Sequence, residues 1–198
     1  DALPISEFIS ASHGIPKQVR DDKKSILVWG GSQGAERINE MIVEKLTDYL
    51  KKYELYHLCG EKNFAKYDAL KKNLPNKLKD KYHLYGIVGR EIFKMISQAD
   101  LVVSRAGSSL FELAALGKAT IVIPYPAAAA DHQTKNADYF FKNNAAIVLK
   151  ESETDAPSLK KSVDGLMQDA PRREELSENI KKLAQEDAAE IIVKYILK

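Results

Sequence analysis

The stretch between Asp100 and Asn136 constrains the fold more than any other part of the chain. It contains two short apolar runs, Leu101–Ser104 and Thr120–Pro124, joined by a helical segment that opens near Gly107. Strand, helix and strand in this order form a βαβ unit, in which the two strands are parallel. Polar residues follow both strands, and the carboxyl ends of parallel strands meet at one edge of a sheet. In open α/β folds that edge binds the ligand, so these polar residues are expected to line one site.

Strands and helices alternate through the rest of the chain as well. An apolar run at Ser25–Trp29 ends at two glycines and is typical of a buried parallel strand. Further strands are expected at residues 53–59, 81–88 and 145–149, and helices at residues 33–52, 61–72, 89–96, 132–142, 158–167 and 172–196. This alternation predicts a Rossmann-like, doubly wound parallel α/β sheet of about six strands with helices on both faces. Residues 1–24 are interpreted as a lead-in segment, and residues 25–198 as one domain.

Composition excludes several classes of function. Thirty basic and 28 acidic residues are spread through the 198-residue chain, so its net charge of +2 gives little support to nucleic-acid binding. The single cysteine, Cys59, has no partner for an internal disulfide or a metal site, which favours a reducing compartment. No apolar run approaches the length of a membrane span, and no signal segment opens the chain. The first residue is Asp1, which is consistent with a domain cut from a longer protein.

The turn at Gly30–Ala35, with the sequence GGSQGA, follows the first strand and precedes a helix. Glycines let the backbone approach an anion, and a helix N-terminus offers unpaired N–H groups, so the turn suits a phosphate. Its first two glycines are adjacent, unlike those of the dinucleotide fingerprint G-x-G-x-x-G. The alternative is that Gly31 and Gly34 only permit tight packing of strand and helix. Ser32 adds a hydroxyl donor that packing alone would not require.

The segment after the strand Leu101–Ser104 offers a second group of candidates. Glu112 lies in the first turns of the next helix, where it either interacts with the helix dipole or accepts hydrogen bonds from a ligand's hydroxyls. Arg105, at the strand end, pairs either with a phosphate or with a neighbouring carboxylate.

The residues Asp131, His132 and Gln133 follow the strand Thr120–Pro124. They are interpreted either as a helix N-cap with ordinary surface residues or as a reader of sugar hydroxyls. In principle His132 can also act as a catalytic base, but no Ser or Cys nucleophile is recognisable near it in the sequence. His57 and His83 lie within apolar strands and are expected to be structural.

Together these stretches resemble the C-terminal half of the MurG family, the peptidoglycan N-acetylglucosaminyltransferases of the two-domain GT-B type. The motifs that carry the resemblance occur in the family's order over nearly the whole chain: Gly30–Ala35 with Asn39, Ala99–Gly107, Phe111–Gly117, Ile123–Pro126 and Asp131–Ala137.

The resemblance implies that this half binds the donor, UDP-GlcNAc. By position, the turn around Ser32 would hold the diphosphate, Glu112 the ribose hydroxyls, and His132 with Gln133 the GlcNAc hydroxyls. The segment 87–89 would flank the uracil, and the two serines that open the helix would lie near the phosphates. The full set expected at the donor is Gly31, Ser32, Gln33, Gly34, Ile87, Val88, Arg105, Gly107, Ser108, Ser109, Glu112, Asp131, His132, Gln133 and Asn136.

The reaction implied is transfer of GlcNAc to undecaprenyl-diphosphate-MurNAc-pentapeptide, giving lipid II with inversion at the anomeric carbon. Neither a metal nor another cofactor is expected, because helix N-termini and hydroxyls can stabilise the departing diphosphate. The general base and the lipid-linked acceptor would belong to an N-terminal half that is absent here, so this chain alone is expected to be inactive. The full-length enzyme would be cytoplasmic and peripheral at the inner face of the bacterial membrane, and this half's membrane contact would be indirect.

Three departures from the family pattern bear on affinity. The chain reads LPIS at residues 3–6, with Ser6 where the family usually has an arginine. The segment Gly107–Glu112 is one residue shorter than the common form, and four alanines at 127–130 replace a run that often contains aromatic and acidic residues. These changes predict weak binding of UDP-GlcNAc by the isolated domain.

Two further interpretations stay open at this point. One is a standalone subunit that works with a separate acceptor or membrane subunit, similar to the two-subunit eukaryotic GlcNAc transferase of lipid-linked oligosaccharide synthesis. The other is a nucleotide-binding module without transferase activity, or an NAD-binding domain. The glycine spacing argues against NAD, and so does the absence of an acidic residue at the end of the second strand, since Glu61 comes later.

Overall fold

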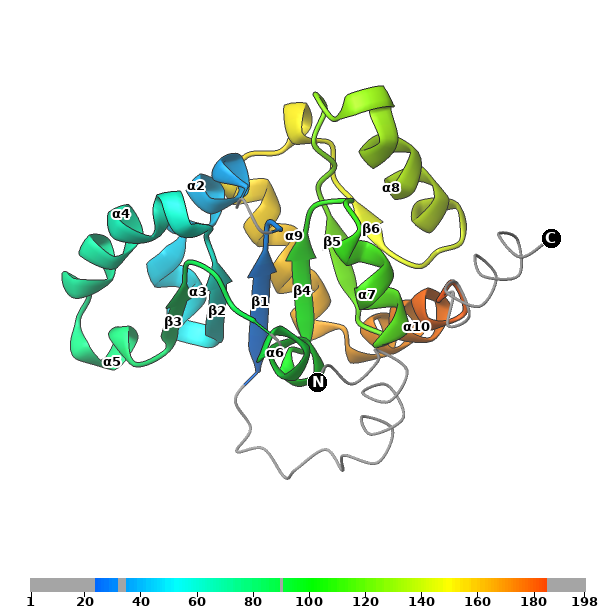
Figure 1. Cartoon of the computed structure of the whole chain (residues 1–198). Helices are drawn as coiled ribbons and strands as arrows, with labels where there is room; N and C mark the ends of the chain where they lie inside the picture. The colour runs from blue at the N-terminus through cyan, green and yellow to red at the C-terminus, as the bar shows by residue number, and fades with distance from the viewer. Residues whose placement is uncertain (1–23, 32–34, 90, 185–198) are drawn as a thin grey trace, which may run out of the picture.

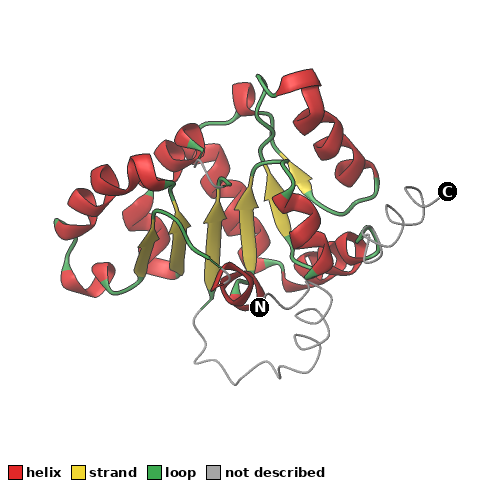
Figure 2. Cartoon of the chain, viewed as in Figure 1, coloured by secondary structure: helices red, strands yellow, loops and turns green. Residues whose placement is uncertain are grey.

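The structure, a computed structural model, describes residues 24–31, 35–89 and 91–184. In this part of the chain six parallel strands form one sheet, with helices on both faces (Figures 1 and 2). The strands are β1 (Ser25–Trp29), β2 (Glu54–Leu58), β3 (Tyr82–Tyr85), β4 (Leu101–Ser104), β5 (Thr120–Val122) and β6 (Ile147–Val148). The predicted fold class is confirmed.

Helices connect the strands, and two more follow the last strand. They are α2 (Glu36–Glu44), α3 (Leu46–Lys52), α4 (Glu61–Lys72), α5 (Asn76–Lys79), α6 (Glu91–Gln98), α7 (Ser109–Ala115), α8 (His132–Lys142), α9 (Ala156–Gln168) and α10 (Ala170–Lys181). Two 3-10 turns, η1 (Ala129–Asp131) and η2 (Glu151–Glu153), lie before α8 and α9. The helix expected at 33–52 is divided at Lys45, whose backbone angles (φ −110°, ψ 18°) leave the helical region.

The sheet order is β3-β2-β1-β4-β5-β6, so the direction of winding reverses between β1 and β4. Trp29 aligns with Ser104, and Ser104 aligns with Val122. The carboxyl ends of β1, β4 and β5 are therefore neighbours. Ligands of doubly wound folds bind where the strand order reverses, which directs attention to the loops that leave these three strands.

Alternate residues of each strand supply two separate apolar cores. On β1, Ile26 and Val28 pack with α2, α3, α4 and α9, whereas Leu27 packs with α6, α7 and α8. Figure 1 shows α6 in front of the sheet and α9 behind it. Helix α10 contributes Leu176 to the first core and Ile180 to the second. The strands are apolar on both faces because helices bury both, as the continuous apolar runs predicted.

Candidate functional site

Two predicted segments, 105–112 and 126–136, meet at the carboxyl edge of the sheet. Asn136 on α8 donates a hydrogen bond from Nδ2 to the carbonyl oxygen of Ala106, over 2.9 Å. Gln133, one turn earlier, accepts a hydrogen bond at Oε1 from the backbone N–H of Tyr125, over 3.0 Å. The first turns of α8 are therefore tied to the loops after both β4 and β5, and the expected convergence of these segments is confirmed.

Two glycines at this edge face open space. Gly31 follows β1 with a φ of +87°, a conformation that favours glycine, and a Cβ placed on it would meet no atom within 4 Å. Gly107 follows β4, and a Cβ there would also meet nothing. At both positions the space beside the Cα is free of other described atoms. Ser32, Gln33 and Gly34, which complete the predicted phosphate turn, lie outside the described residues.

Helix α7 carries three of the candidates. Ser108 occupies the N-cap position, is exposed and makes no side-chain capping bond, while Ser109 is buried. Glu112 is half-buried, and its carboxylate makes no hydrogen bond or ion pair within the part of the chain that the structure describes. Burial raises the pKa of Glu112 above its usual range, because removal from water disfavours the charged form. Partial burial of this carboxylate without a partner among the described residues has a free-energy cost, which hydrogen bonds from a ligand would offset.

Arg105 is engaged in contacts within the chain. Its Nη1 donates to the carbonyl oxygens of Ile123 and Pro124, over 3.1 and 3.3 Å. Its Nη2 lies 2.5 Å from Oε2 of Glu151 in an ion pair that is nearly closed to solvent. Of the two alternatives for this arginine, the structure favours the neighbouring carboxylate.

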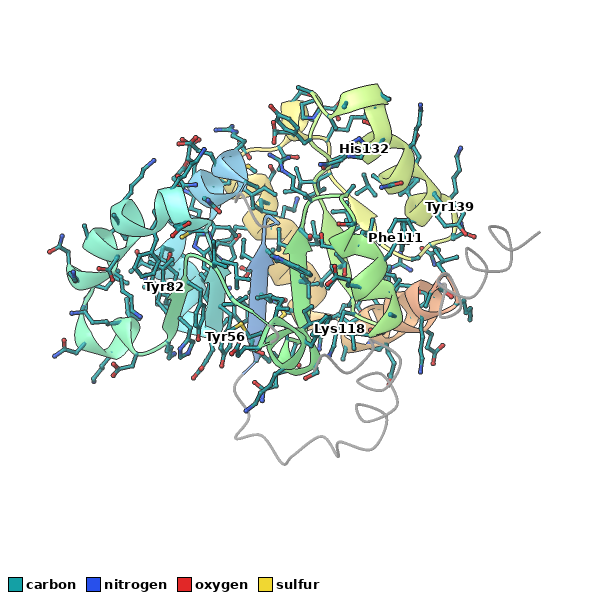
Figure 3. All side chains as sticks on the ribbon, viewed as in Figure 1. Tyr56, Tyr82, Phe111, Lys118, His132 and Tyr139 are labelled. Atoms are coloured by element: carbon teal, nitrogen blue, oxygen red, sulfur yellow. The ribbon has the colours of Figure 1, made fainter. Side chains whose placement is uncertain are left out.

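The polar side chains of α8 have defined orientations. His132, at the start of α8 (Figure 3), has Nδ1 2.7 Å from the carbonyl oxygen of Ala129. A carbonyl can only accept, so Nδ1 carries the proton and Nε2 presents a lone pair in the neutral imidazole. Gln133 holds Tyr125 through its amide oxygen, which leaves its NH₂ group available as a donor.

Asp131 is exposed and occupies the N-cap position of α8, but its side chain makes no capping bond. Both Asp131 (φ 54°) and the preceding Ala130 (φ 50°) have left-handed backbone conformations, which cost about 1–3 kcal/mol each in non-glycine residues. The alternative that Asp131 acts as an ordinary cap is therefore not what the structure describes. Strain of this kind concentrates in loops that contact ligands.

Ile87 and Val88 follow β3 at the same edge of the sheet. Ile87 is 63% exposed, whereas Val88 packs against the core on the α6 and α7 side. The same core includes Ala137 and Phe140 of α8. Their proposed place beside a base stays a prediction.

Sequence reasoning missed Tyr125, whose ring lies 5.3 Å from the guanidinium carbon of Arg105 and is 45% exposed. It also missed Glu151, because the ion pair joins residues 46 positions apart with no local pattern. Asn39 carried a signal: it falls among the buried apolar positions of α2, where a polar side chain needs a partner.

Within the described ranges, no three His, Cys, Asp or Glu side chains are grouped closely enough to hold a metal ion. The same part of the chain contains no helix with the length and apolar character needed to cross a bilayer.

The geometry can be set beside known proteins. Residues 25–192 match the family model described as the glycosyltransferase family 28 C-terminal domain. The chain belongs to this family. Its match covers every strand and all the candidate site residues described above.

Relatives of this family 28 domain include two bacterial proteins named UDP-N-acetylglucosamine–N-acetylmuramyl-(pentapeptide) pyrophosphoryl-undecaprenol N-acetylglucosamine transferase. The one from Desulfotalea psychrophila is 37% identical over 204 residues, covering 96% of this chain and 51% of the relative. The one from Flavobacterium psychrophilum is 39% identical over 180 residues, covering 89% of this chain and 47% of the relative. The chain thus spans about half the length of the curated relatives it matches.

Solved structures give the same result. MurG of Acinetobacter baumannii aligns with a TM-score of 0.75 and 26% identity over 96% of this chain and 52% of that protein. The resemblance to the MurG family is confirmed. The solution structure of ALG13, at 16% identity and a TM-score of 0.57, covers 79% of this chain and 92% of its own, and shares the fold.

Proposed function

We propose that this chain is the donor-binding half of an inverting glycosyltransferase that takes GlcNAc from UDP-GlcNAc. The acceptor of the complete enzyme is undecaprenyl-diphosphate-MurNAc-pentapeptide, and the product is lipid II. The family and the names of the relatives support this assignment. The residues at the carboxyl edge of the sheet supply its chemistry.

The observation that carries the proposal is the carboxylate of Glu112, which has no hydrogen-bond or ion-pair partner among the residues that the structure describes. It is half-buried on α7, beside the point where the strand order reverses. A ribose offers two adjacent hydroxyl donors, and one carboxylate can accept from both. The ribose hydroxyls would supply the hydrogen-bond partners that the described chain does not provide. These bonds would offset the free-energy cost of burying the carboxylate and so strengthen binding.

The diphosphate is assigned to the open backbone around Gly31 and Gly107. Each glycine lies in the turn between a strand and a following helix, where N–H groups and the helix dipole favour an anion. Ser108 and Ser109 add hydroxyl donors at the start of α7. These groups also stabilise the UDP that leaves in the reaction, which is why no metal is assigned to the site.

The sugar is assigned to the start of α8. His132 presents an acceptor at Nε2 and Gln133 presents a donor at its amide nitrogen. A sugar hydroxyl both donates and accepts, so this pair of groups complements one hydroxyl or two neighbouring ones.

Glu112→Ala tests the assignment. The change should weaken binding of UDP and UDP-GlcNAc alike, by about 1–3 kcal/mol, because both ligands carry the ribose. Isothermal titration calorimetry measures both affinities, and circular dichroism establishes that the variant is folded.

The matched control is Glu174→Ala, which removes an exposed carboxylate from α10, away from the edge of the sheet. Its affinity for UDP should equal that of the unmodified chain. Unchanged UDP binding in a folded Glu112 variant would refute the ribose assignment.

The general base and the acceptor surface are assigned to a partner half, and the enzyme is placed at the cytoplasmic face of the membrane, where its lipid-linked acceptor resides. This chain alone should bind UDP-GlcNAc with a dissociation constant above about 1 µM, or a binding free energy weaker than about −8.2 kcal/mol. It should not transfer GlcNAc to the lipid acceptor. Sub-micromolar affinity, or transfer by the chain alone, would contradict this division of roles.

A further inference from the structure

One mostly buried ion pair joins three loops at the carboxyl edge of the sheet. Arg105, directly after β4, donates from Nη1 to the carbonyl oxygens of Ile123 and Pro124, over 3.1 and 3.3 Å. Its Nη2 lies 2.5 Å from Oε2 of Glu151 on η2, the turn that follows β6. Strand β6 pairs with β5 at that end of the sheet (Figure 1). Both terminal nitrogens of the guanidinium therefore have partners within the chain, and Glu151 is the charged one.

Tyr125 follows the two carbonyls that Arg105 contacts, and its ring lies over the same guanidinium. The centre of the ring is 5.3 Å from the guanidinium carbon, which is within the range of a cation–π contact. The backbone N–H of Tyr125 donates to Oε1 of Gln133 over 3.0 Å. Tyr125 is thus held by Arg105 on one side and is bonded to the first turn of α8 on the other.

A single peptide group carries the connection from Arg105 to Gln133. The carbonyl of Pro124 and the N–H of Tyr125 belong to one planar peptide unit, so a bond that orients the carbonyl also orients the N–H. The side-chain amide of Gln133 is planar as well, and the bond at its Oε1 therefore fixes the direction of its NH₂ group. A rotation of the guanidinium away from Pro124 would consequently change the direction in which Gln133 donates.

We propose that Glu151 is a positioning residue for recognition of the donor sugar. It holds Arg105 in the orientation that fixes the peptide between residues 124 and 125, and through this peptide it fixes the amide of Gln133. The proposal rests on the proposed function, in which Gln133 donates to a hydroxyl of GlcNAc. Glu151 itself contacts no ligand in this scheme, and it acts only through Arg105.

Stability alone does not account for this arrangement. A buried ion pair contributes little more than apolar side chains of similar volume, because the loss of hydration offsets the attraction. The guanidinium instead supplies direction, since its planar fork makes hydrogen bonds at fixed angles to the two carbonyls and to Glu151. Apolar side chains in these two places would fill the space without a bond that orients the peptide.

The experiment compares Glu151→Leu with the unmodified chain by calorimetry, using UDP-GlcNAc and UDP, which lacks the sugar. The dissociation constant of UDP-GlcNAc should rise about fourfold and that of UDP less than about twofold, because one hydrogen bond to the sugar is weakened. In a Gln133→Ala background the same substitution should not change the ratio of the two constants further, since the donor is already absent. An unchanged ratio in folded Glu151→Leu, or an equal further change in the Gln133→Ala background, would overturn the positioning role.

The matched control is Asp164→Leu. Asp164 on α9 is a carboxylate of similar exposure that also joins separate elements, with Oδ2 2.8 Å from Nζ of Lys52 and Oδ1 3.0 Å from the hydroxyl of Tyr53. Both partners directly precede β2, at the opposite, amino edge of the sheet. The substitution should lower the stability to urea and leave the ratio of affinities at its unmodified value. A shift in the ratio equal to that of Glu151→Leu would show general damage and would overturn the proposal.

If Glu151→Leu does not fold, Glu151→Gln replaces it, because the amide keeps the shape of the carboxylate and removes its charge. The ratio should then change about twofold with UDP binding unchanged, and no change would overturn the proposal. Hydrogen exchange of the Tyr125 amide, measured by NMR, gives a readout without ligand and should be faster in the Glu151 variant than in Asp164→Leu. Unchanged exchange at Tyr125 refutes the positioning role, whereas absence of UDP binding in the unmodified chain refutes the proposed function.

Discussion

At the residue scale, local hydrogen bonds decide which atom of each polar side chain is left for a ligand. Gln133 uses its amide oxygen for the N–H of Tyr125, and His132 uses Nδ1 for the carbonyl of Ala129. The free atoms are one amide nitrogen and one imidazole lone pair. The two neighbouring side chains therefore present opposite hydrogen-bonding characters, which suits a sugar hydroxyl.

Two substitutions at Gln133 separate its role toward the sugar from its role in the loop. Gln133→Ala should weaken UDP-GlcNAc binding by about 1 kcal/mol and leave UDP binding nearly unchanged. Gln133→Glu keeps an oxygen for Tyr125 but loses the NH₂ donor, so it should reproduce the loss for UDP-GlcNAc. Calorimetry with both ligands is the measurement. Equal losses for UDP and UDP-GlcNAc in the alanine variant would mean that Gln133 serves the loop instead.

His57 gives a prediction for stability against pH. Its pKa is about 3 in the folded chain, against an ordinary value of 6.5, so the unfolded chain binds the proton first as the pH falls. Stability contributed by the neutral ring is fully present above pH 6.5 and is lost between pH 6.5 and about 3. The loss is on the order of 5 kcal/mol.

Urea unfolding at several pH values, compared between the unmodified chain and His57→Gln, measures this contribution. The glutamine does not titrate, so the variant should lose less stability across that window. Parallel pH dependences in the two proteins would contradict the assignment of the effect to His57.

At the element scale, Arg105 connects three parts of the chain at the end of β4. Its guanidinium reaches two carbonyls after β5 and the carboxylate of Glu151 on η2. The pair therefore connects the loops that follow β4, β5 and β6. The sequence left a phosphate and a neighbouring carboxylate open as partners of Arg105, and in the fold its partner is the carboxylate of Glu151.

Substitution of one partner in this pair should destabilise the chain more than substitution of both. Arg105→Met or Glu151→Leu alone leaves a buried charge without its partner, at a cost of about 3–5 kcal/mol. The double variant should be more stable than the sum of the two losses predicts. Urea unfolding of the unmodified chain, the two single variants and the double variant gives a double-mutant cycle. Strictly additive losses of stability would argue against an energetic coupling between the two side chains.

At the scale of the whole molecule, the sheet order gathers the site. The order β3-β2-β1-β4-β5-β6 puts β1, β4 and β5 side by side, although about 90 residues separate the first from the last. Helices cover both faces of the sheet (Figure 2), and ligands of doubly wound folds bind at the carboxyl edge, where the loops after these strands lie.

Ligand protection of the whole fold distinguishes a UDP-sugar domain from an NAD-binding one. UDP-GlcNAc at 100 times its dissociation constant should stabilise the chain by about 2.7 kcal/mol, which raises the melting temperature by several degrees. NAD at the same concentration should leave the melting temperature unchanged. Differential scanning fluorimetry compares the two ligands. A rise in melting temperature with NAD but not with UDP-GlcNAc would support an NAD-binding domain instead.

The sequence determined the fold class and brought the candidate residues after β4 and β5 to one edge of the sheet. Short apolar strands alternating with helices leave few arrangements that bury both faces, and polar residues after β4 and β5 must then share an edge. The tertiary structure decided which polar atoms are free. It directed Arg105 to Glu151, linked Asn39 to His57 and Tyr82, and left Glu112 without a partner among the described residues. Each of these outcomes depends on groups far apart in the chain, and local periodicity carries no information about which of them meet.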